Sequence, residues 1–357
     1  MDSIEKLLKE LTEAPGVPGY EEGARQVVKH YCKPLGKIST DRLGSVICEK
    51  KGKTAAPRIM LAGHMDEIGF MVRLITKEGF IKFTALGGWW DHILLTQRVV
   101  IKTRKGDVLG VIGAKPPHLL RGDQRNKMVE KKKMYIDTGL ASKKAVEKVG
   151  VRVGDPIVPV SAFTPMADPK IYMAKAFDDR AGCAMVIAAM QKLKSRAHPN
   201  TIIGAHTVQE EVGLRGASTA VELCNPDVGI VLETDIAGDT PGISDEESPT
   251  TMGGGPSILL YDARMIPNLK LRDLVIDTAK KGKIPLQFNS MDGGATDGAA
   301  IHLHKSGVPT IVIGVPTRHI HSHNGMLSRK DFDNAVKLLV ALVIRLDKKT
   351  VDGLTPW

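Results

Sequence analysis

The chain has 357 residues, which is enough for one large α/β domain and a smaller one. Hydrophobic residues make up 42% and charged residues 25%, an ordinary composition for a soluble globular protein, and no apolar run reaches the roughly eighteen residues that span a bilayer. The formal net charge of +10 comes from dispersed lysines, and aromatic residues are only 4% of the chain, so stacking surfaces for nucleic acid are scarce. We therefore expect neither a membrane protein nor a nucleic-acid-binding protein.

The amino-terminal part begins with two helical patterns, residues 3–13 and 21–32, and continues with strand-like residues 37–50 and 58–64. The first helix has apolar residues at a helical spacing and charges on its other face. It lacks the basic start and apolar core of a signal peptide, so we expect a cytoplasmic protein. Residues 68–160 then form short β-type runs separated by glycine turns, with one helical stretch at 141–149, which predicts a small inserted β-rich domain.

From residue 161 onward, helical patterns and apolar strands alternate again, which predicts a sheet covered by helices on both faces. The predicted helices are residues 178–194, 269–280, 296–305 and 329–346. The expected fold class is therefore α/β. A three-layer α/β/α catalytic domain with a central mixed sheet is formed by residues 1–67 and 161–357, and a small barrel-like β-rich domain, residues 68–160, is inserted into it.

Acidic residues and histidines lie at or just beyond several of the apolar strands. They are His64 and Asp66 in LAGHMDEIGF, Asp178 in KAFDDRAG, Glu210 and Glu211 in HTVQEEVGLRG, Glu233 in VLETDIAGD, and His321 in TRHIHSHNG. Open α/β sheets gather ligands beyond the strand ends, so these motifs can converge on one site. In a two-metal hydrolase, one of two adjacent carboxylates ligates a metal and the other takes the proton from the attacking water.

The types of these residues point to a site for two divalent metals. Two histidines and three carboxylates suit zinc, cobalt or manganese, and here these are His64, Asp178, Glu211, Glu233 and His321. The three carboxylates together with a hydroxide also offset most of the charge of two divalent cations. A single-zinc site would need fewer acids.

Six blocks of this chain resemble one known family. The blocks are AGHMDEIGF, KAFDDRAG, EEVGLRGA, the AGD that follows Glu233, GGATDGAAIH and PTRHIHSH. In the same order they resemble the TET-type dinuclear metallo-aminopeptidases, family forty-two of the MH clan, which include glutamyl- and leucyl-aminopeptidase-like enzymes. The resemblance covers essentially the whole chain and implies an enzyme that removes amino-terminal residues from peptides with two divalent metal ions per subunit.

The resemblance also implies a role for each residue of the site. Asp178 bridges both metals, His64 and Glu233 hold one metal, and Glu211 and His321 hold the other. Glu210 is the general base, and Asp66 orients an imidazole. The family usually has Asp where this chain has Glu233, so Asp235 is the alternative ligand, and His319 and His323 are alternatives to His321. Thr296 and Asp297, in the GGATDGAA block, are candidates for the substrate side of the site.

Two structural expectations follow from the same resemblance. The peptide bond between Asp178 and Asp179 is expected to be cis. The inserted domain is expected to form dimers that assemble into a tetrahedral dodecamer, and Trp89 and Trp90 lie either at such an interface or in that domain's own core.

Two other hydrolase functions remain as alternatives. An amidohydrolase or deacylase that acts on N-acyl amino acids or blocked peptides would use identical ligands. A glycosidase needs two carboxylates in a different arrangement, and histidines in ligand positions argue against it. The four cysteines are widely spaced and predict no disulfide framework.

Overall fold

The computed structural model of the protein describes residues 1–355, apart from the side chain of Gln124, and divides into two compact units. The first unit comprises Met1–Glu67, Ala162–Ile320 and the chain from Asn324 onward; the second comprises Ile68–Ser161 and His321–His323. The sequence placed the boundaries after residues 67 and 160. The structure puts the second boundary one residue later and adds the short segment that carries His321 to the second unit.

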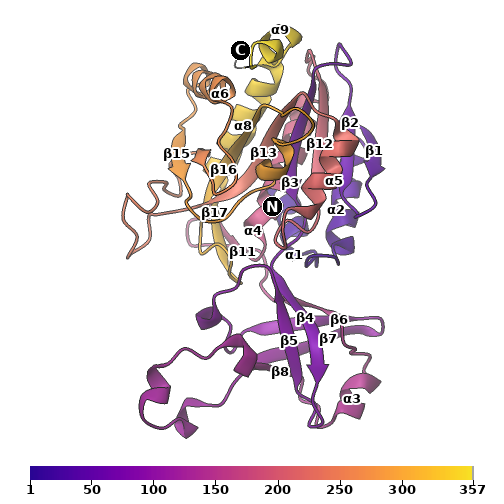
Figure 1. Ribbon diagram of the computed structural model, residues 1–357, viewed down its shortest axis with the longest axis vertical. Coiled ribbons are helices and arrows are strands. Elements are labelled where there is room, and N and C mark those ends of the chain that lie inside the picture. The colour runs from indigo at the N-terminus through magenta and orange to yellow at the C-terminus, as the bar shows by residue number, and fades with distance from the viewer. Residues whose placement is uncertain (356–357) are drawn as a thin grey trace. The chain divides into compact units, whose positions relative to one another are not determined.

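The first unit is a mixed sheet between two layers of helices (Figure 1). Its helices are α1 (Ser3–Glu13), α2 (Glu22–Cys32), α4 (Phe177–Leu193), α5 (Arg215–Cys224), α6 (Leu269–Gly282), α7 (Gly298–Ile301), α8 (Arg329–Arg345) and α9 (Lys348–Asp352). Its strands are β1 (Lys37–Thr40), β2 (Val46–Lys50), β3 (Arg58–His64), β10 (Thr164–Pro165), β11 (Ile171–Ala174), β12 (Thr201–Thr207), β13 (Val228–Ile236), β14 (Ser257–Tyr261), β15 (Gln287–Ser290), β16 (Thr310–Arg318) and β17 (Gly325–Ser328).

The centre of this sheet is parallel. Strands run in the order β1-β2-β12-β3-β13-β16-β17-β11-β10, and β14 joins β16 and β15 off this path. The pairs β12–β3, β3–β13 and β13–β16 are parallel, while β2 and β17 pair antiparallel with this central group. Because parallel strands end at one edge, the residues that follow β3 and β12 are brought together.

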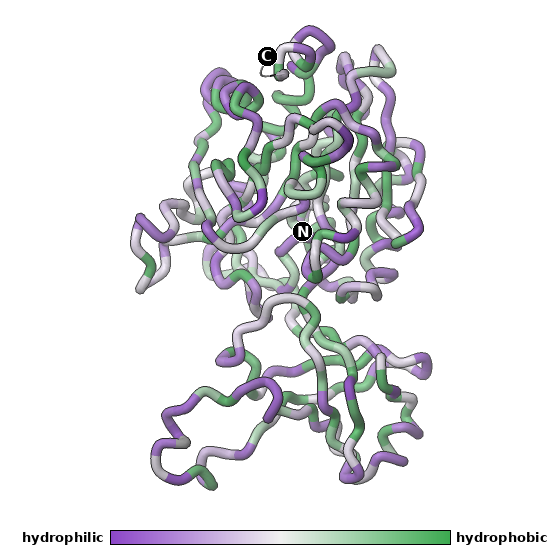
Figure 2. The backbone as a smooth tube through the Cα atoms, viewed as in Figure 1, coloured by the Kyte–Doolittle hydropathy of each residue, from purple (hydrophilic) through white to green (hydrophobic). Residues whose placement is uncertain are grey.

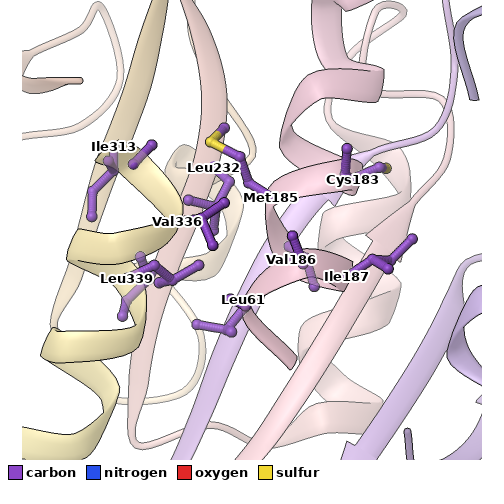
Figure 3. Close-up of a cluster of buried hydrophobic side chains, with 14 of the residues drawn as sticks. Leu61, Cys183, Met185, Val186, Ile187, Leu232, Ile313, Val336 and Leu339 are labelled. Carbon is purple, nitrogen blue, oxygen red and sulfur yellow. The ribbon is translucent and has the colours of Figure 1, made fainter. Parts of the chain in front are cut away.

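Alternate residues of each central strand pack on opposite faces of the sheet. On β3, Leu61 joins the core under α4 and α8, whereas Met60 and Ala62 join the core under α5 and α7. Figure 3 shows Leu61, Leu232 and Ile313 of the sheet beside side chains of α4 and α8. The expected three-layer α/β/α architecture with a mixed sheet is confirmed.

The second unit is built around a closed antiparallel barrel. Its strands, in barrel order, are β4 (Gly69–Ile75), β5 (Ile81–Leu86), β8 (Tyr135–Asp137), β7 (Gly106–Gly113), β6 (Arg98–Thr103) and β9 (Pro156–Pro159). The unit also contains the α-helix α3 (Lys143–Lys148) and several short 3-10 helices. Phe70, Ile101 and Ile136 are among the side chains that fill its interior. Closure pairs every strand on both sides and leaves no open edge. Within each unit, hydrophobic residues lie mainly along the strands, whereas the helices carry both hydrophobic and hydrophilic residues, as Figure 2 shows.

Trp89 and Trp90 differ within this unit. Trp89 is 6% exposed, its ring stacks on Phe70 with centroids 4.9 Å apart, and its indole N–H donates to the carbonyl oxygen of Gly69 at 3.1 Å. Trp90 is 63% exposed. The first tryptophan therefore belongs to the unit's own core, and only the second is open to solvent.

The predicted helix at residues 296–305 is wrong in length, because α7 has only four residues. After Ile301 the chain turns back, Lys305 adopts a positive φ of 52°, and the amide of Val308 donates to the carbonyl oxygen of His302 at 3.0 Å. This turn leads the chain into β16, so the helix ends at Ile301.

The structure also bears on the peptide bond at Asp178, on the cysteines and on membrane-spanning helices. The peptide bond between Asp178 and Asp179 is cis, as the resemblance implied. All four cysteines are free and buried. Within residues 1–355, no helix is long and apolar enough to cross a membrane.

Candidate metal and active site

The strand alternation directs two predicted ligands to the same side of the sheet. His64 is the last residue of β3, two residues after Ala62, which faces the α5 and α7 layer. Glu233 lies two residues after Val231, which faces the same layer on the neighbouring parallel strand β13. Both side chains are therefore buried on one side of the sheet, 1% and 5% exposed.

Four carboxylates surround the imidazole of His64. Its ligand atoms lie within 4.8 Å of those of Glu210 and Glu233 in one set, and of Asp178 and Glu211 in a second set. His64 Nε2 is 3.1 Å from Asp178 Oδ1 and 3.8 Å from Glu210 Oε2. Each of these two sets could hold a metal ion, and both include the imidazole of His64.

Asp66 holds the paired glutamates in place. Its side chain is fully buried, its Oδ1 accepts the backbone N–H of Glu210 at 3.0 Å, and its Oδ2 accepts that of Glu211 at 3.1 Å. The same carboxylate lies 3.5 Å from Nδ1 of His64, whose ring also faces the carbonyl oxygen of Asp66 at 3.1 Å. One side chain thus orients both acids and the imidazole.

Asp179 makes contacts that the sequence did not predict. Its carboxylate is fully buried and accepts the backbone N–H of His64 at 3.0 Å and that of Gly182 at 2.9 Å. It therefore ties the end of β3 to the beginning of α4, where Asp178 and Asp179 lie outside helical φ and ψ. This contact fixes Asp178 next to His64.

A buried ionic cluster was also missed. Arg180 is fully buried and donates to the carbonyl oxygens of Ala14, at 3.0 Å, and Met65. Glu67 accepts two hydrogen bonds from the ammonium of Lys175, at 2.6 and 2.7 Å, and lies 3.7 Å from the guanidinium of Arg180. The cluster binds the segment between α1 and α2 to the residues that follow His64.

The electrostatics of the site favour a bound cation. Burial, together with neighbouring carboxylates, raises the pKa of Glu210 and the pKa of Glu233 well above the ordinary glutamate value. Burial alone would lower the pKa of His64, but the carboxylates of Glu210, Asp178 and Asp66 outweigh it and raise that pKa. Without a cation, ionising all of these buried acids together would cost a large electrostatic free energy. Divalent ions therefore suit this donor set.

The two acids of β13 have different partners. Glu233 belongs to the cluster around His64. Asp235 accepts hydrogen bonds from the hydroxyl of Ser257 at 2.5 Å and from the amide of Asn289 at 2.7 Å. Its carboxylate already has donors, which favours Glu233 as the ligand.

The two candidates for the substrate side are both buried. Asp297 is 0% exposed, its Oδ2 accepts the hydroxyl of Thr207 at 2.5 Å, and burial raises its pKa to about 6. Thr296 is 7% exposed and donates to Asp262 at 3.3 Å. A role of either residue in binding substrate stays a prediction.

His321 belongs to the second unit. There its Nδ1 lies 2.9 Å from the carbonyl oxygen of Gly88, and the ring of His323 contacts Trp89 with centroids 4.9 Å apart. Burial lowers the pKa of His323 to about 4. The choice of His321 over His319 and His323 as a ligand stays a prediction.

Fold and site together define a class of protein. A buried cluster of carboxylates and an imidazole, located at the carboxyl ends of parallel strands in a three-layer α/β/α domain, is typical of metal-dependent hydrolases. The comparison with known proteins gives the family. Residues 44–338 match the model of the M42 glutamyl aminopeptidases, and residues 2–28 match a second model, AMPT. The chain belongs to the M42 family and is a peptide hydrolase.

Named relatives and solved structures agree with this assignment. The chain is 35% identical over 346 residues to the lysyl aminopeptidase of Pyrococcus furiosus, covering 96% of this chain and 97% of that protein. It is 34% identical over 355 residues to the glutamyl aminopeptidase of Lactococcus lactis, covering 98% of each. A TET aminopeptidase from a marine sediment archaeon of the Thaumarchaeota has 49% identity and a TM-score of 0.97 over 99% of both chains.

A further structure bears on assembly. The TET1 peptidase of Pyrococcus horikoshii, described as able to assemble into a tetrahedron or a large octahedral shell, is 32% identical to this chain. The match has a TM-score of 0.87 and covers 96% of this chain and all of that one.

Proposed function

We propose that this peptidase is a cytoplasmic aminopeptidase that works with two divalent ions of zinc, cobalt or manganese. The observation that carries this proposal is the gathering of four carboxylates around the buried imidazole of His64. The proposed ligands are His64, Asp178, Glu211, Glu233 and His321, with Asp178 bridging. When bound, the ions would polarise the scissile carbonyl and lower the pKa of the attacking water.

Glu210 carries the proton in this proposal. Its carboxylate accepts a proton from water while the water oxygen bonds to the carbonyl carbon of the substrate. As the C–N bond breaks, Glu210 returns that proton to the nitrogen of the leaving amine. Asp66 keeps Glu210 in position through the backbone amide, and the side chain of Glu210 is only 10% exposed, so bulk water is largely excluded.

A panel of paired peptides tests the substrate class. An aminopeptidase requires a free α-ammonium, so acetylation of the amino terminus should nearly abolish cleavage. Equal rates on free and acetylated peptides would instead indicate the deacylase or an endopeptidase. The panel should include both acidic and basic amino-terminal residues, because relatives at nearly equal identity are named glutamyl and lysyl aminopeptidases.

The protein is further proposed to form a tetrahedral dodecamer from dimers, with the barrel unit providing the dimer contact. Support comes from the assembly described for the TET1 peptidase and from the outer surface of the barrel. Leu109 and Val111 of β7 are 52% and 40% exposed, and Leu74 of β4 is 52% exposed. Leu109 and Val111 lie two residues apart on β7 and therefore face the same side, and contiguous exposed apolar surface is typical of an interface. Light scattering at several protein concentrations tests the assembly, and an active monomer would contradict it.

A further inference from the structure

A groove lies in the helical layer of the first unit, and its lining comes mainly from α8 and the carboxyl end of α4, with one residue of α1. It has a volume of about 780 Å³. Its apolar lining includes Ile4 of α1, Ala188 of α4 and Val336, Val340 and Ile344 of α8, and Ile344 is 37% exposed. None of these residues belongs to the metal cluster.

The rim of the groove is basic. Lys192, Arg196 and Lys337 are exposed there, and none of them pairs with a carboxylate among residues 1–355. Lys337 donates only to a backbone carbonyl, that of Gly282, at 2.9 Å. The acid of the lining, Asp333, is already paired with Arg329 at 3.0 Å. The groove therefore presents apolar surface surrounded by uncompensated positive charge.

The loop between β13 and β14 has the complementary character. It carries Asp245, Glu246 and Glu247, the longest uninterrupted run of acids in a chain of net charge +10, and all three are exposed. Ile243, immediately before this turn, is 37% exposed. Glu247 accepts the backbone N–H and the hydroxyl of Ser244 at 2.8 and 2.9 Å.

Hydrogen bonds also fix the base of this loop. The hydroxyls of Ser248 and Thr250 both donate to the carbonyl oxygen of Ile236 at 2.7 Å. The turn is therefore preorganised, with two carboxylates and one aliphatic side chain facing solvent, so that binding costs little ordering entropy.

We propose that the acidic turn of residues 243–247 in one copy of the chain docks into the basic-rimmed groove between α4 and α8 of a second copy. Ile243 enters the apolar lining, while Asp245 and Glu246 pair with Lys192 and Arg196. Because two different surfaces meet, the contact is head-to-tail and closes a ring when repeated by a rotation. A tetrahedral shell requires such a contact around its threefold axes in addition to its twofold dimers. This inference rests on the proposed shell assembly.

Charge reversal on each side tests the contact. Lys192→Glu with Arg196→Glu should reduce the wild-type shell to dimers in light scattering, and Asp245→Lys with Glu246→Lys should do the same. Combining all four substitutions should restore the shell. Lys51→Glu with Lys53→Glu is the matched control, because it makes the same charge change at an exposed turn and should leave the shell intact. Shells retained by both double variants, or no restoration in the combined one, would overturn the proposal.

Cross-linking gives an independent readout. Ile243→Cys with Ala341→Cys places one thiol on the turn and one in the groove, and the four native cysteines are buried. A bis-maleimide reagent should give covalent trimers from a closed threefold ring, whereas covalent dimers only, or no cross-link, would contradict it. Hydrolysis of a single-aminoacyl substrate, measured in each sample, should stay at the wild-type rate per chain. A wild type that is active but never assembles would refute the shell and this contact while leaving the aminopeptidase proposal standing.

Discussion

Asp66→Asn isolates the part of the site that orients the catalytic residues. The substitution keeps the shape of the side chain, but only one oxygen remains to accept a hydrogen bond. At present Oδ1 accepts the amide of Glu210 at 3.0 Å and Oδ2 that of Glu211 at 3.1 Å, so one amide must lose its acceptor. The new NH₂ group would also face a donor.

The expected magnitude follows from that single lost bond. A hydrogen bond to a charged acceptor contributes about 1.5–3 kcal/mol, which corresponds to a roughly ten- to hundredfold change in a rate or a binding constant. We therefore expect metal affinity, kcat, or both to fall by about ten- to hundredfold, the range typical of residues that orient metal ligands.

Asp235→Asn is the matched control. It makes the same chemical change in a buried aspartate that accepts hydrogen bonds from Ser257 and Asn289 and stands two residues after Glu233. Metal titration followed by steady-state kinetics should show the loss for Asp66→Asn and wild-type metal affinity for Asp235→Asn. Unchanged metal affinity and kcat in Asp66→Asn would refute the positioning role, and an equal loss of metal in Asp235→Asn would make Asp235 the ligand.

Three other substitutions give separate tests. Glu210→Gln should lower turnover by at least roughly 10²- to 10⁴-fold while elemental analysis finds the metal content unchanged, and near wild-type activity would exclude Glu210 as the base. Arg180→Met should lower the free energy of unfolding by about 3–5 kcal/mol in a denaturant titration, because it leaves buried carbonyl oxygens without a donor and removes a cation beside Glu67. Arg272→Met, whose partly exposed side chain pairs with Asp273, should cost about 1 kcal/mol or less. Burial raises the pKa of Glu21 from 4.5 to about 7, so the wild-type folded state loses stability as pH rises through this range. The free energy of unfolding of Glu21→Gln, relative to that of wild type, should therefore increase by up to about 3 kcal/mol between about pH 5 and pH 8. A difference in unfolding free energy that does not change with pH would contradict this.

The sequence predicted which strands bring their terminal residues together at the site. The apolar runs before His64 and Glu210 and around Glu233 are long enough to be recognised as buried strands, and parallel strands bring their carboxyl ends together. The structure indeed gathers Glu210, Glu211, Glu233 and Asp178 at His64. Local pattern and topology were sufficient for these residues.

Contacts between distant segments were not predictable in the same way. Arg180 bonds to a carbonyl 166 residues away in the chain, and Glu67 meets Lys175 across 108 residues. A charged residue in a sequence gives no sign that burial will pair it, because most charged residues are solvated. The length of α7 was mispredicted for a related reason. The turn that ends this helix is fixed by a hydrogen bond from the backbone amide of Val308 to the carbonyl oxygen of His302.

The central claim is that two divalent ions at the carboxylate cluster around His64 carry out aminopeptidase chemistry. The most direct measurement is to titrate metal-free protein with zinc or cobalt while following hydrolysis of a peptide with a free amino terminus. Activity should be absent without metal and should rise to a plateau at two equivalents per chain. Full activity in the metal-free protein, or a plateau at one equivalent, would contradict the account.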